Sequence, residues 1–215
     1  MIDIHTHILP ACDDGADNFL TAITEIRKMI NAGVTDIVLT PHFIRNVYNN
    51  HTDVIESKFN YLQNEVEKQK IPVTLYKGAE VYLDENIFED IESENFNINN
   101  SDYILVETNL SGFPKNLLEI LYKLVKNNYK PILAHPERYP DIIQNPTLAE
   151  DLIYRNVYFQ INAGSLIGLY GKRISKTAWK LLSRGHVHFL ASDTHCNNDE
   201  YLLPLAYKVI KKNLG

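Results

Sequence analysis

The sequence has few cysteines and no long apolar run. These two features argue against a disulfide-rich protein and against a membrane-spanning protein. Its 215 residues include two cysteines, Cys12 and Cys196, which lie far apart in the chain. This excludes a disulfide-rich secreted scaffold, and we expect two free thiols in a reducing compartment, by default the cytoplasm. No apolar stretch reaches the roughly 18–20 residues of a membrane span, and the N-terminus lacks the pattern of a signal peptide.

Runs of positive charge are also missing. The chain has 21 Lys and Arg against 27 Asp and Glu, a net charge of −6, and its basic residues do not cluster. Because duplex binding depends on basic patches, we expect no nucleic acid partner. A hydrophobic fraction of 45% with 22% charged residues is typical of a folded chain, and the length predicts a single domain over residues 1–215.

Short apolar runs alternate with helical patterns along the chain. Several runs, such as Ile37-Val38-Leu39, are almost continuously apolar, which favours parallel strands buried on both faces. The predicted strands are residues 2–7, 36–40, 73–78, 103–107, 131–134, 158–162 and 187–191.

Helical periodicity lies between these strands. Apolar residues recur every three to four positions in three segments, which are Ile23 to Ile30, Leu117 to Val125 and Ile174 to Leu182. The first stripe ends at Gly33, a plausible helix stop. Residues 87–100 are less regular and predict a short helix with a loop. Alternating strands and helices indicate an α/β fold, and periodicity alone leaves open an open sheet or a barrel.

Potential metal ligands follow the predicted strands at their carboxyl ends. Six strands each deliver at least one His, Asp or Glu there; these residues are His5, His7, His42, Glu80, Glu107, His135, Asp193 and His195. In a barrel such ends converge on one face, whereas in an open sheet they spread along an edge. We therefore favour a distorted TIM-like barrel.

Two pairs of potential ligands have the spacing of neighbours on one face of a strand. Residues i and i+2 of a strand point to the same side, so His5 and His7 can chelate one cation. Asp193 and His195 repeat this spacing near the other end of the chain. Either pair alone is a weak signal, but together with single ligands at the intervening strand ends they predict a metal site.

Three further histidines carry no such prediction. His51 stands alone, and His186 and His188 precede the last apolar run, which should place them at the opposite end of the barrel. We interpret all three as structural residues.

The ligand types indicate which cations the site would hold. Imidazoles and carboxylates without a necessary thiolate suit Mn²⁺, Fe²⁺ or Zn²⁺ better than Ca²⁺. Eight or nine ligands exceed what one ion takes, so we expect two or three divalent ions that share carboxylates. Closely spaced ions can clamp a phosphate and activate a water, which favours a phosphoesterase.

The motifs of the chain resemble those of a known superfamily. They are Asp3-Ile4-His5-Thr6-His7, Asp13-Asp14-Gly15-Ala16, Thr40-Pro41-His42, Gly78-Ala79-Glu80, Ala134-His135-Pro136-Glu137-Arg138 and Ala191-Ser192-Asp193-Thr194-His195. This order resembles the polymerase and histidinol phosphatase (PHP) superfamily. Within it, the chain is most similar to bacterial tyrosine-protein phosphatases of capsule and exopolysaccharide operons.

The resemblance implies a distorted barrel of seven βα units, a (β/α)7 barrel of the PHP type, with a trinuclear and often manganese-containing site. It assigns His5, His7, Glu80 and Asp193 to the first ion, Glu80, Glu107 and His135 to the second, and Asp14, His42 and His195 to the third. Asp13 is the nearest rival of Asp14.

The resemblance also implies residues that act on the phosphate. Arg138 matches the arginine of the family's His-Pro-Glu-Arg motif and can grip phosphate oxygens through two N–H groups. Relatives carry a second arginine shortly after the last motif histidine, but residues 196–200 contain none. Arg45 or Arg173 could substitute for it, and we choose Arg45 as the predicted second substrate-binding residue. The implied catalytic residues are Arg138, Asp14 and His42.

Our mechanistic hypothesis is attack on phosphorus by a hydroxide that the metals hold, with the metals and Arg138 stabilising the charge. A cysteine nucleophile is excluded, because Cys-x₅-Arg phosphatases need an arginine six residues after the cysteine. Asn18 and Leu202 occupy these positions.

The resemblance implies a partner that contains phosphotyrosine, a bacterial tyrosine autokinase that controls polysaccharide export. Alternatives are a small-molecule phosphatase of the histidinol phosphate type and a non-catalytic metal-binding scaffold. Because the chain ends at Gly215, sooner than its relatives, we expect no C-terminal helix, and we leave oligomerisation open.

Overall fold

All seven predicted strands are present in the structure, a computed structural model that describes residues 1–214. They correspond to β1 (Ile2–Asp3), β2 (Asp36–Leu39), β4 (Thr74–Lys77), β6 (Tyr103–Glu107), β7 (Lys130–Ala134), β8 (Tyr158–Asn162) and β9 (Phe189–Ala191). The first strand is shorter than predicted, because only Ile2 and Asp3 pair with β2.

Two further short strands continue the paths of β2 and β4. They are β3 (His42–Phe43) and β5 (Glu80–Tyr82). The first path is interrupted at Pro41, which has no N–H to donate to a ladder. The backbone N–H of Glu80 still donates to the carbonyl of Pro41 at 3.0 Å, so the two paths stay paired across the break. The chain therefore makes seven strand paths.

Within residues 1–214, all pairs between the named strands are parallel and belong to two sheets. One has the order β1-β2-β4, and the other β3-β5-β6-β7-β8-β9. The segments after β1 and β9 are joined, because the N–H of His7 donates to the carbonyl of Thr194 (2.9 Å) and that of Asp193 to the carbonyl of His5 (3.0 Å). The strands thus form the predicted distorted barrel. Its hydrogen-bond ladder is interrupted and does not run continuously around it.

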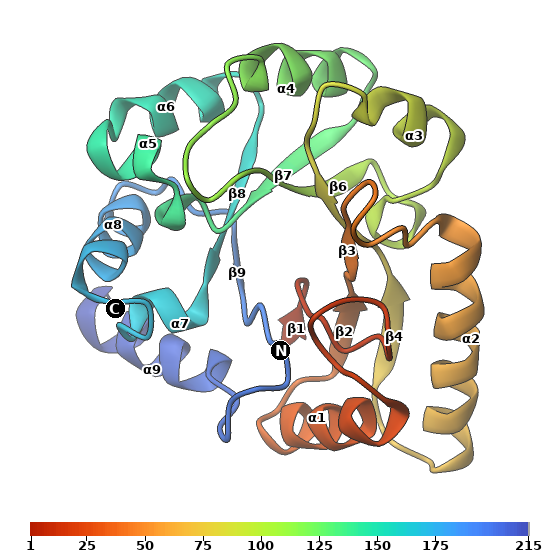
Figure 1. Cartoon of the computed structure of the whole chain (residues 1–215). Helices are drawn as coiled ribbons and strands as arrows, with labels where there is room; N and C mark the ends of the chain where they lie inside the picture. The colour runs from red at the N-terminus through yellow and green to blue at the C-terminus, as the bar shows by residue number, and fades with distance from the viewer. Residues whose placement is uncertain (215) are drawn as a thin grey trace.

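Helices surround the strands on the outside (Figure 1). They are α1 (Phe19–Asn31), α2 (Thr52–Lys68), α3 (Ile87–Ser93), α4 (Leu117–Lys126), α5 (Pro140–Gln144), α6 (Thr147–Tyr154), α7 (Ala163–Leu166), α8 (Lys172–Ser183) and α9 (Leu203–Leu214), with 3-10 turns at η1 (Ile98–Asn100) and η2 (Pro136–Arg138). None of these helices within residues 1–214 is both long and apolar enough to cross a membrane.

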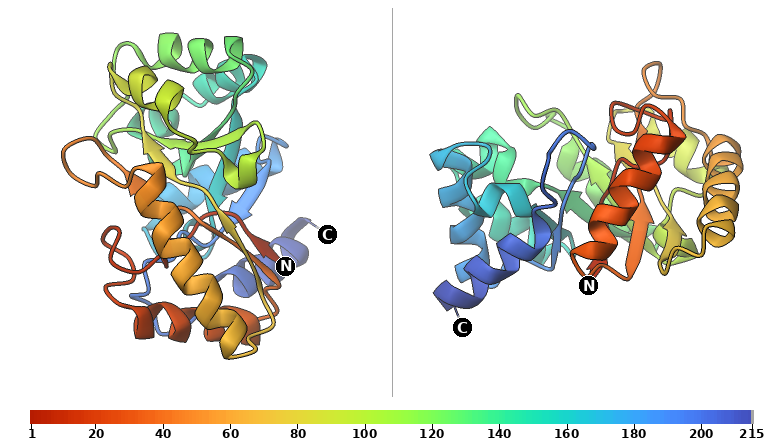
Figure 2. Two further views of the ribbon diagram at one scale, coloured as in Figure 1. Left: turned by 90° about the vertical axis from the view of Figure 1, so that its right-hand side faces the viewer. Right: turned by 90° about the horizontal axis from the view of Figure 1, so that it is seen from below.

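The three predicted helical stripes are α1, α4 and α8. Asn18 caps helix α1, because its side chain accepts the N–H of Thr21. The helix is followed by Gly33 with φ +90°, as the glycine stop predicts. The predicted apolar segment from Leu117 to Val125 includes Leu118, but this residue is exposed in α4, whereas Ile120 is buried. The expectation of no C-terminal helix is wrong, because α9 packs Leu203 and Ala206 into the core and lies beside α7 on the outside of the barrel (Figures 1 and 2).

The inside of the barrel is apolar beneath the carboxyl ends of the strands. Alternate residues of β6 share one face, which places Tyr103, Leu105 and Glu107 on the same side at successive heights. Leu105 packs there with Ile132 and Ala134 of β7. This plug closes the barrel below Glu107, so polar groups at the top of the strands meet above an apolar floor.

Candidate metal centre

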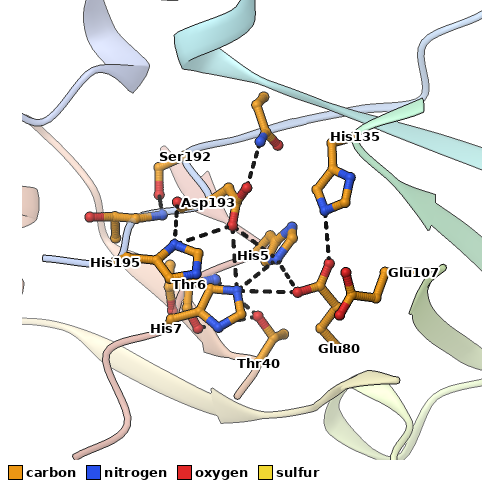
Figure 3. A network of polar contacts seen from close by, with 12 residues as sticks. His5, Thr6, His7, Thr40, Glu80, Glu107, His135, Ser192, Asp193 and His195 are labelled. Carbon is orange, nitrogen blue, oxygen red and sulfur yellow. Dashed lines mark hydrogen bonds and ion pairs between the residues drawn. The ribbon is translucent and has the colours of Figure 1, made fainter. Parts of the chain in front are cut away.

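The structure brings all nine predicted ligands to the carboxyl ends of the strands. Six of them are wholly or almost wholly buried; these are His5, His7, Glu80, Glu107, His135 and Asp193. His42 and His195 are partly exposed, and the side chain of Asp14 is 56% exposed at the mouth. Figure 3 shows the imidazoles and carboxylates pointing toward one another from different strands.

The first group of ligand atoms comes from His5, His7 and Asp193. The two Nε2 atoms are 3.0 Å apart, and each lies 3.4 Å from Oδ1 of Asp193. Oε2 of Glu80 completes the group at 3.1 Å from Nε2 of His5 and 3.3 Å from Nε2 of His7. These are the four residues that the resemblance assigns to the first ion.

The second group differs from the one that the resemblance implies. It contains His42, Glu80 and Glu107, with Nδ1 of His42 3.1 Å from Oε2 of Glu80 and 2.9 Å from Oε1 of Glu107. His135, which the resemblance places here, lies on the other side of Glu80, with its Nε2 3.1 Å from Oε1. The carboxylate of Glu80 thus stands between imidazoles on both of its oxygens.

The third group is Asp14, His42 and His195, together with His7. Oδ1 of Asp14 is 3.4 Å from Nε2 of His195 and 3.7 Å from Nε2 of His42. Asp13, the rival of Asp14, accepts from Nδ1 of His7 at 2.7 Å and from the N–H of His42 at 2.9 Å. Asp13 therefore orients a ligand from behind, while Asp14 faces the centre.

Two hydrogen bonds fix which ring nitrogens face the centre. Oε1 of Gln160 can only accept, so the Nδ1 of His5 that lies 2.8 Å away carries a proton. Asp13 acts on Nδ1 of His7 in the same way. When each ring carries only this one proton, both Nε2 atoms present lone pairs to the centre, as in metal sites whose outer partners set the tautomer.

A buried polar chain behind the centre was not predicted from the sequence. Nε2 of Gln160 donates to Oδ1 of Asn162 (2.8 Å), whose Nδ2 donates to Oδ2 of Asp193 (2.5 Å). The backbone N–H of Asn162 and the hydroxyl of Ser165 donate to Oε1 of Glu137 at 2.9 and 2.6 Å. The signal was present, because Gln160 and Asn162 are polar residues with i, i+2 spacing at the end of an apolar strand.

In the absence of cations, protons bind between these groups. Burial disfavours the charged form of His5, but the charges of Glu80 and Asp193 outweigh it and raise the pKa of His5 to about 9. Burial would raise the pKa of Glu80 and of Asp193, yet the nearby imidazoles lower both. Burial likewise acts against Asp13, whose bond to His7 nevertheless lowers its pKa to about 2. A cation would replace these protons.

The donor set fits divalent cations. Oε2 of Glu80 is buried and lies within 3.3 Å of nitrogens of His5, His7 and His42, yet it takes part in no hydrogen bond. A buried carboxylate oxygen without a hydrogen bond is costly unless another positive group satisfies it. Imidazole nitrogens and carboxylate oxygens that converge in this way suit Mn²⁺, Fe²⁺ or Zn²⁺.

The predicted phosphate-binding arginines lie in different places. Arg138 lines the cavity of about 170 Å³ at the centre, with its Nη1 3.4 Å from Oδ2 of Asp193. Arg45 pairs with Asp90 instead, at 2.6 Å from Nη2 to Oδ2, and it does not line this cavity. Its role in substrate binding stays a prediction. Arg173, in α8, does not line the cavity either.

Neither cysteine lies among the ligand groups of residues 1–214. Burial raises the pKa of Cys12 to about 11 and that of Cys196 to about 12. Because the thiolate is the nucleophilic form, both thiols are poorly reactive at neutral pH. This agrees with the exclusion of a cysteine-based phosphatase mechanism.

Comparison with models of protein families assigns the chain to a family. The model for capsular polysaccharide synthesis, CpsB/CapC, matches residues 1–215. The chain belongs to the CpsB/CapC family. The resemblance that the motifs indicate is therefore confirmed.

Relatives within the CpsB/CapC family share about a third of their residues with the chain. It is 38% identical to the putative tyrosine-protein phosphatase CapC of Staphylococcus aureus and 34% identical to the tyrosine-protein phosphatase YwqE of Bacillus subtilis (strain 168). Each comparison spans 196 residues, 91% of this chain and 77% of the relative.

Solved structures agree with this family assignment. One crystal structure, described with YwqE from Bacillus subtilis and CpsB from Streptococcus pneumoniae as unique metal-dependent tyrosine phosphatases, matches with a TM-score of 0.94 and 32% identity over 100% of this chain and 88% of that chain. A histidinol phosphate phosphatase from Lactococcus lactis matches with a TM-score of 0.65 and 16% identity, over 100% and 93% of the two chains. The second likeness concerns the fold alone.

Proposed function

We propose that this chain is a metal-dependent tyrosine-protein phosphatase that acts in capsule or exopolysaccharide synthesis. Family membership and the names of relatives at 38% and 34% identity support the activity. The observation that carries it is the position of Oε2 of Glu80, buried among three imidazoles without a hydrogen bond. In this proposal residues 1–215 act as one phosphatase domain.

The proposed cofactor is a set of two or three divalent ions, by preference Mn²⁺, with iron or zinc as alternatives. Its ligands are the nine residues at the centre, which are His5, His7, Asp14, His42, Glu80, Glu107, His135, Asp193 and His195. Glu80 would be the shared ligand, because both of its oxygens face imidazoles. When bound, such ions lower the pKa of a water molecule and stabilise negative charge on phosphate oxygens.

The chain's own residues orient the phosphate and the proton. Among residues 1–214, Arg138 is the one arginine that lines the central cavity, and its guanidinium can donate two N–H groups to the phosphate oxygens. Asp14 stands half-exposed at the mouth with His42 and His195 beside it, where its carboxylate can relay a proton from the attacking water to the leaving oxygen. The apolar floor below Glu107 keeps bulk water out of the barrel.

The proposed substrate is a protein that carries phosphotyrosine, and we expect it to be a bacterial tyrosine autokinase in the cytoplasm. We expect no nucleic acid partner, in keeping with the net charge of −6. An oligomer is compatible with this proposal, which does not depend on it.

Turnover assays test the proposal and separate it from its rivals. The purified chain, stripped of metal and reloaded with Mn²⁺, should hydrolyse p-nitrophenyl phosphate, and a phosphotyrosyl peptide should be a better substrate than histidinol phosphate. The reverse preference would indicate a small-molecule phosphatase. If Mn²⁺, Fe²⁺, Co²⁺ and Zn²⁺ all gave no turnover, a non-catalytic metal-binding scaffold would replace the proposed enzyme.

A further inference from the structure

A second cavity adjoins the metal centre. Its volume is about 400 Å³, and it shares Asp193 and His195 with the central cavity. Its other walls are the neutral side chains of Leu169, Tyr170, Asn197 and Asn198. The central cavity of about 170 Å³ is smaller than the roughly 300 Å³ at which pockets for organic ligands begin, whereas the second lies within that range.

The turn that carries Leu169 and Tyr170 is built from glycines. Gly168 and Gly171 flank the pair with φ of +88° and +91°, a conformation that other residues rarely adopt. Gly164 leaves room for them, since a Cβ there would lie 3.0 Å from Leu169 and 3.1 Å from Tyr170. The local sequence thus fixes these two side chains at the cavity wall.

Tyr170 also contacts the residue that we assign to phosphate. The guanidinium carbon of Arg138 lies 5.0 Å from the centre of the Tyr170 ring, within the range of a cation–π contact. Elsewhere in the lining, the carbonyl of Asn198 accepts a hydrogen bond from Lys28 at 3.0 Å, which ties that segment to α1. The cavity is thus lined by an aromatic ring, by two side-chain amides and by two residues of the metal centre.

We infer that this cavity, the Tyr170 cavity, receives the aryl leaving group and adjoining backbone of a phosphotyrosyl segment. The inference rests on the proposed function. Its walls contain no Lys or Arg, so they suit a neutral ring and not a second phosphate. The side chain of Leu169 and the ring of Tyr170 can pack against the substrate ring, and Asn197 and Asn198 offer amides to a peptide backbone.

The cavity places the two ends of the scissile bond in separate compartments. Water oxygen bonds to phosphorus on the side of the metal centre, and the bond from phosphorus to the phenol oxygen breaks. That oxygen keeps the electron pair, takes up the proton that the water releases, and departs as tyrosine into the Tyr170 cavity, while inorganic phosphate stays at Arg138.

Tyr170→Ala, Tyr170→Phe and the control Tyr154→Ala test this assignment. Tyr154 is 90% exposed in α6 and lines neither cavity. Two quantities are measured on the Mn²⁺-loaded chain, which are the KM for a phosphotyrosyl peptide and the inhibition constant of inorganic phosphate, a probe of the phosphate position alone. Tyr170→Ala should raise the KM about five- to tenfold and change the inhibition constant less than about twofold.

The companion variants separate the ring from the fold. Tyr170→Phe keeps the ring and should restore most of the affinity that Tyr170→Ala loses, whereas Tyr154→Ala should match the wild type. Leu169→Ser, at a half-exposed position, should raise the KM in the same direction as Tyr170→Ala by a smaller factor. If Tyr170→Ala unfolds, Leu169→Ser decides the matter. An equal rise of both constants would make Tyr170 a positioning residue for Arg138 and would overturn the subsite.

Failure of the subsite differs from failure of the proposed function. If the wild type is active but neither Tyr170→Ala nor Leu169→Ser changes the KM or the inhibition constant of phosphate, only the assignment of the Tyr170 cavity is contradicted. A wild type that hydrolyses no phosphotyrosyl peptide would sink the proposed function and the subsite with it.

Discussion

Two histidine pairs with the same spacing lie in opposite environments in this molecule. His5 and His7 follow β1, and His186 and His188 precede β9, and each pair is separated by one residue. The first pair lies among carboxylates at the carboxyl ends of the strands. His188 instead accepts the N–H of Phe159 at 3.1 Å through its Nδ1.

The electrostatics of the two pairs differ accordingly. Nearby carboxylates overcome burial and raise the pKa of His5 to about 9. Burial, with His186 beside it, lowers the pKa of His188. No ligand group found within residues 1–214 includes His186 or His188. The spacing of two imidazoles therefore does not make a metal site; carboxylates delivered by neighbouring strands do.

The largest expected effect is that of His5→Ala against His188→Ala. Removing His5 takes away one imidazole of the first ligand group, so we expect Mn²⁺-dependent turnover of p-nitrophenyl phosphate to fall by at least about a hundredfold. The circular dichroism spectrum should stay that of a folded barrel. His188→Ala should keep turnover within a few fold of the wild type. Equal losses of turnover in the two variants would contradict the assignment of a metal-binding role to His5 and a structural role to His188.

Arg138→Ala should have the next largest effect. It removes the guanidinium that we assign to phosphate, and kcat/KM for a phosphotyrosyl peptide should fall about a hundredfold, a magnitude typical of a lost charge-stabilising donor. Mn²⁺ affinity, measured by calorimetry, should change little. A large loss of Mn²⁺ affinity with intact turnover in excess Mn²⁺ would instead show that Arg138 orients the ligand carboxylate of Asp193 and does not bind the phosphate.

Asn162→Leu should have an intermediate effect through the buried chain behind the centre. Its side chain forms hydrogen bonds with both Gln160 and Asp193. Without it, the carboxylate of Asp193 and the amide of Gln160, which orients His5, each lose a hydrogen bond. We expect about a tenfold loss of Mn²⁺ affinity by calorimetry. Asn162→Asp, which keeps the acceptor but adds charge, serves as the matched variant. Unaltered affinity in Asn162→Leu would show that Asp193 needs no support.

The metal-free chain should become less stable as the pH rises from about 6.5 to 9. The pKa values of His5, His7 and His42 are raised, so their protons stabilise the folded state below pH 6.5, and this stability is lost up to about pH 9. The pKa values of His195 and His188 are lowered, so these two groups cost stability below pH 6.5 and act in the opposite sense. One such group contributes about 1.4 kcal/mol per pH unit.

Thermal unfolding of chelator-treated protein at pH 6 and pH 9 measures this effect. With Mn²⁺ bound the direction should reverse, because the ion competes with protons for the same nitrogens. A metal-free Tm that rises with pH would contradict the proton-bound centre.

The smallest expected effect is that of Arg45→Ala. Its guanidinium pairs with Asp90, so we expect a small fall in Tm and little change in the KM for a phosphotyrosyl peptide. A severalfold rise in KM would instead support the predicted role of Arg45 in substrate binding.

Much of the fold follows from the sequence because the strands are apolar and the ligands follow them. All seven strand paths were predicted, whereas β3 and β5 were not, since strands of two and three residues that begin with His42 and Glu80 carry no apolar run. The gathering of ligands was predictable because parallel strands end at one face of a barrel.

Other features depend on contacts between distant residues. The pairing of Arg45 with Asp90 joins positions 45 residues apart, and no local pattern marks it. The same holds for the positions of His42 and His135 at different oxygens of Glu80. Gln160 and Asn162 could have been found, because polar residues inside a buried strand need partners.

A diffraction map at the anomalous edge of manganese, from crystals grown with Mn²⁺, tests the central claim most directly. We predict two or three peaks at the carboxyl ends of the strands, with Glu80 bridging two of them. A map without a peak within bonding distance of His5, His7 and Glu80 would contradict the metal centre.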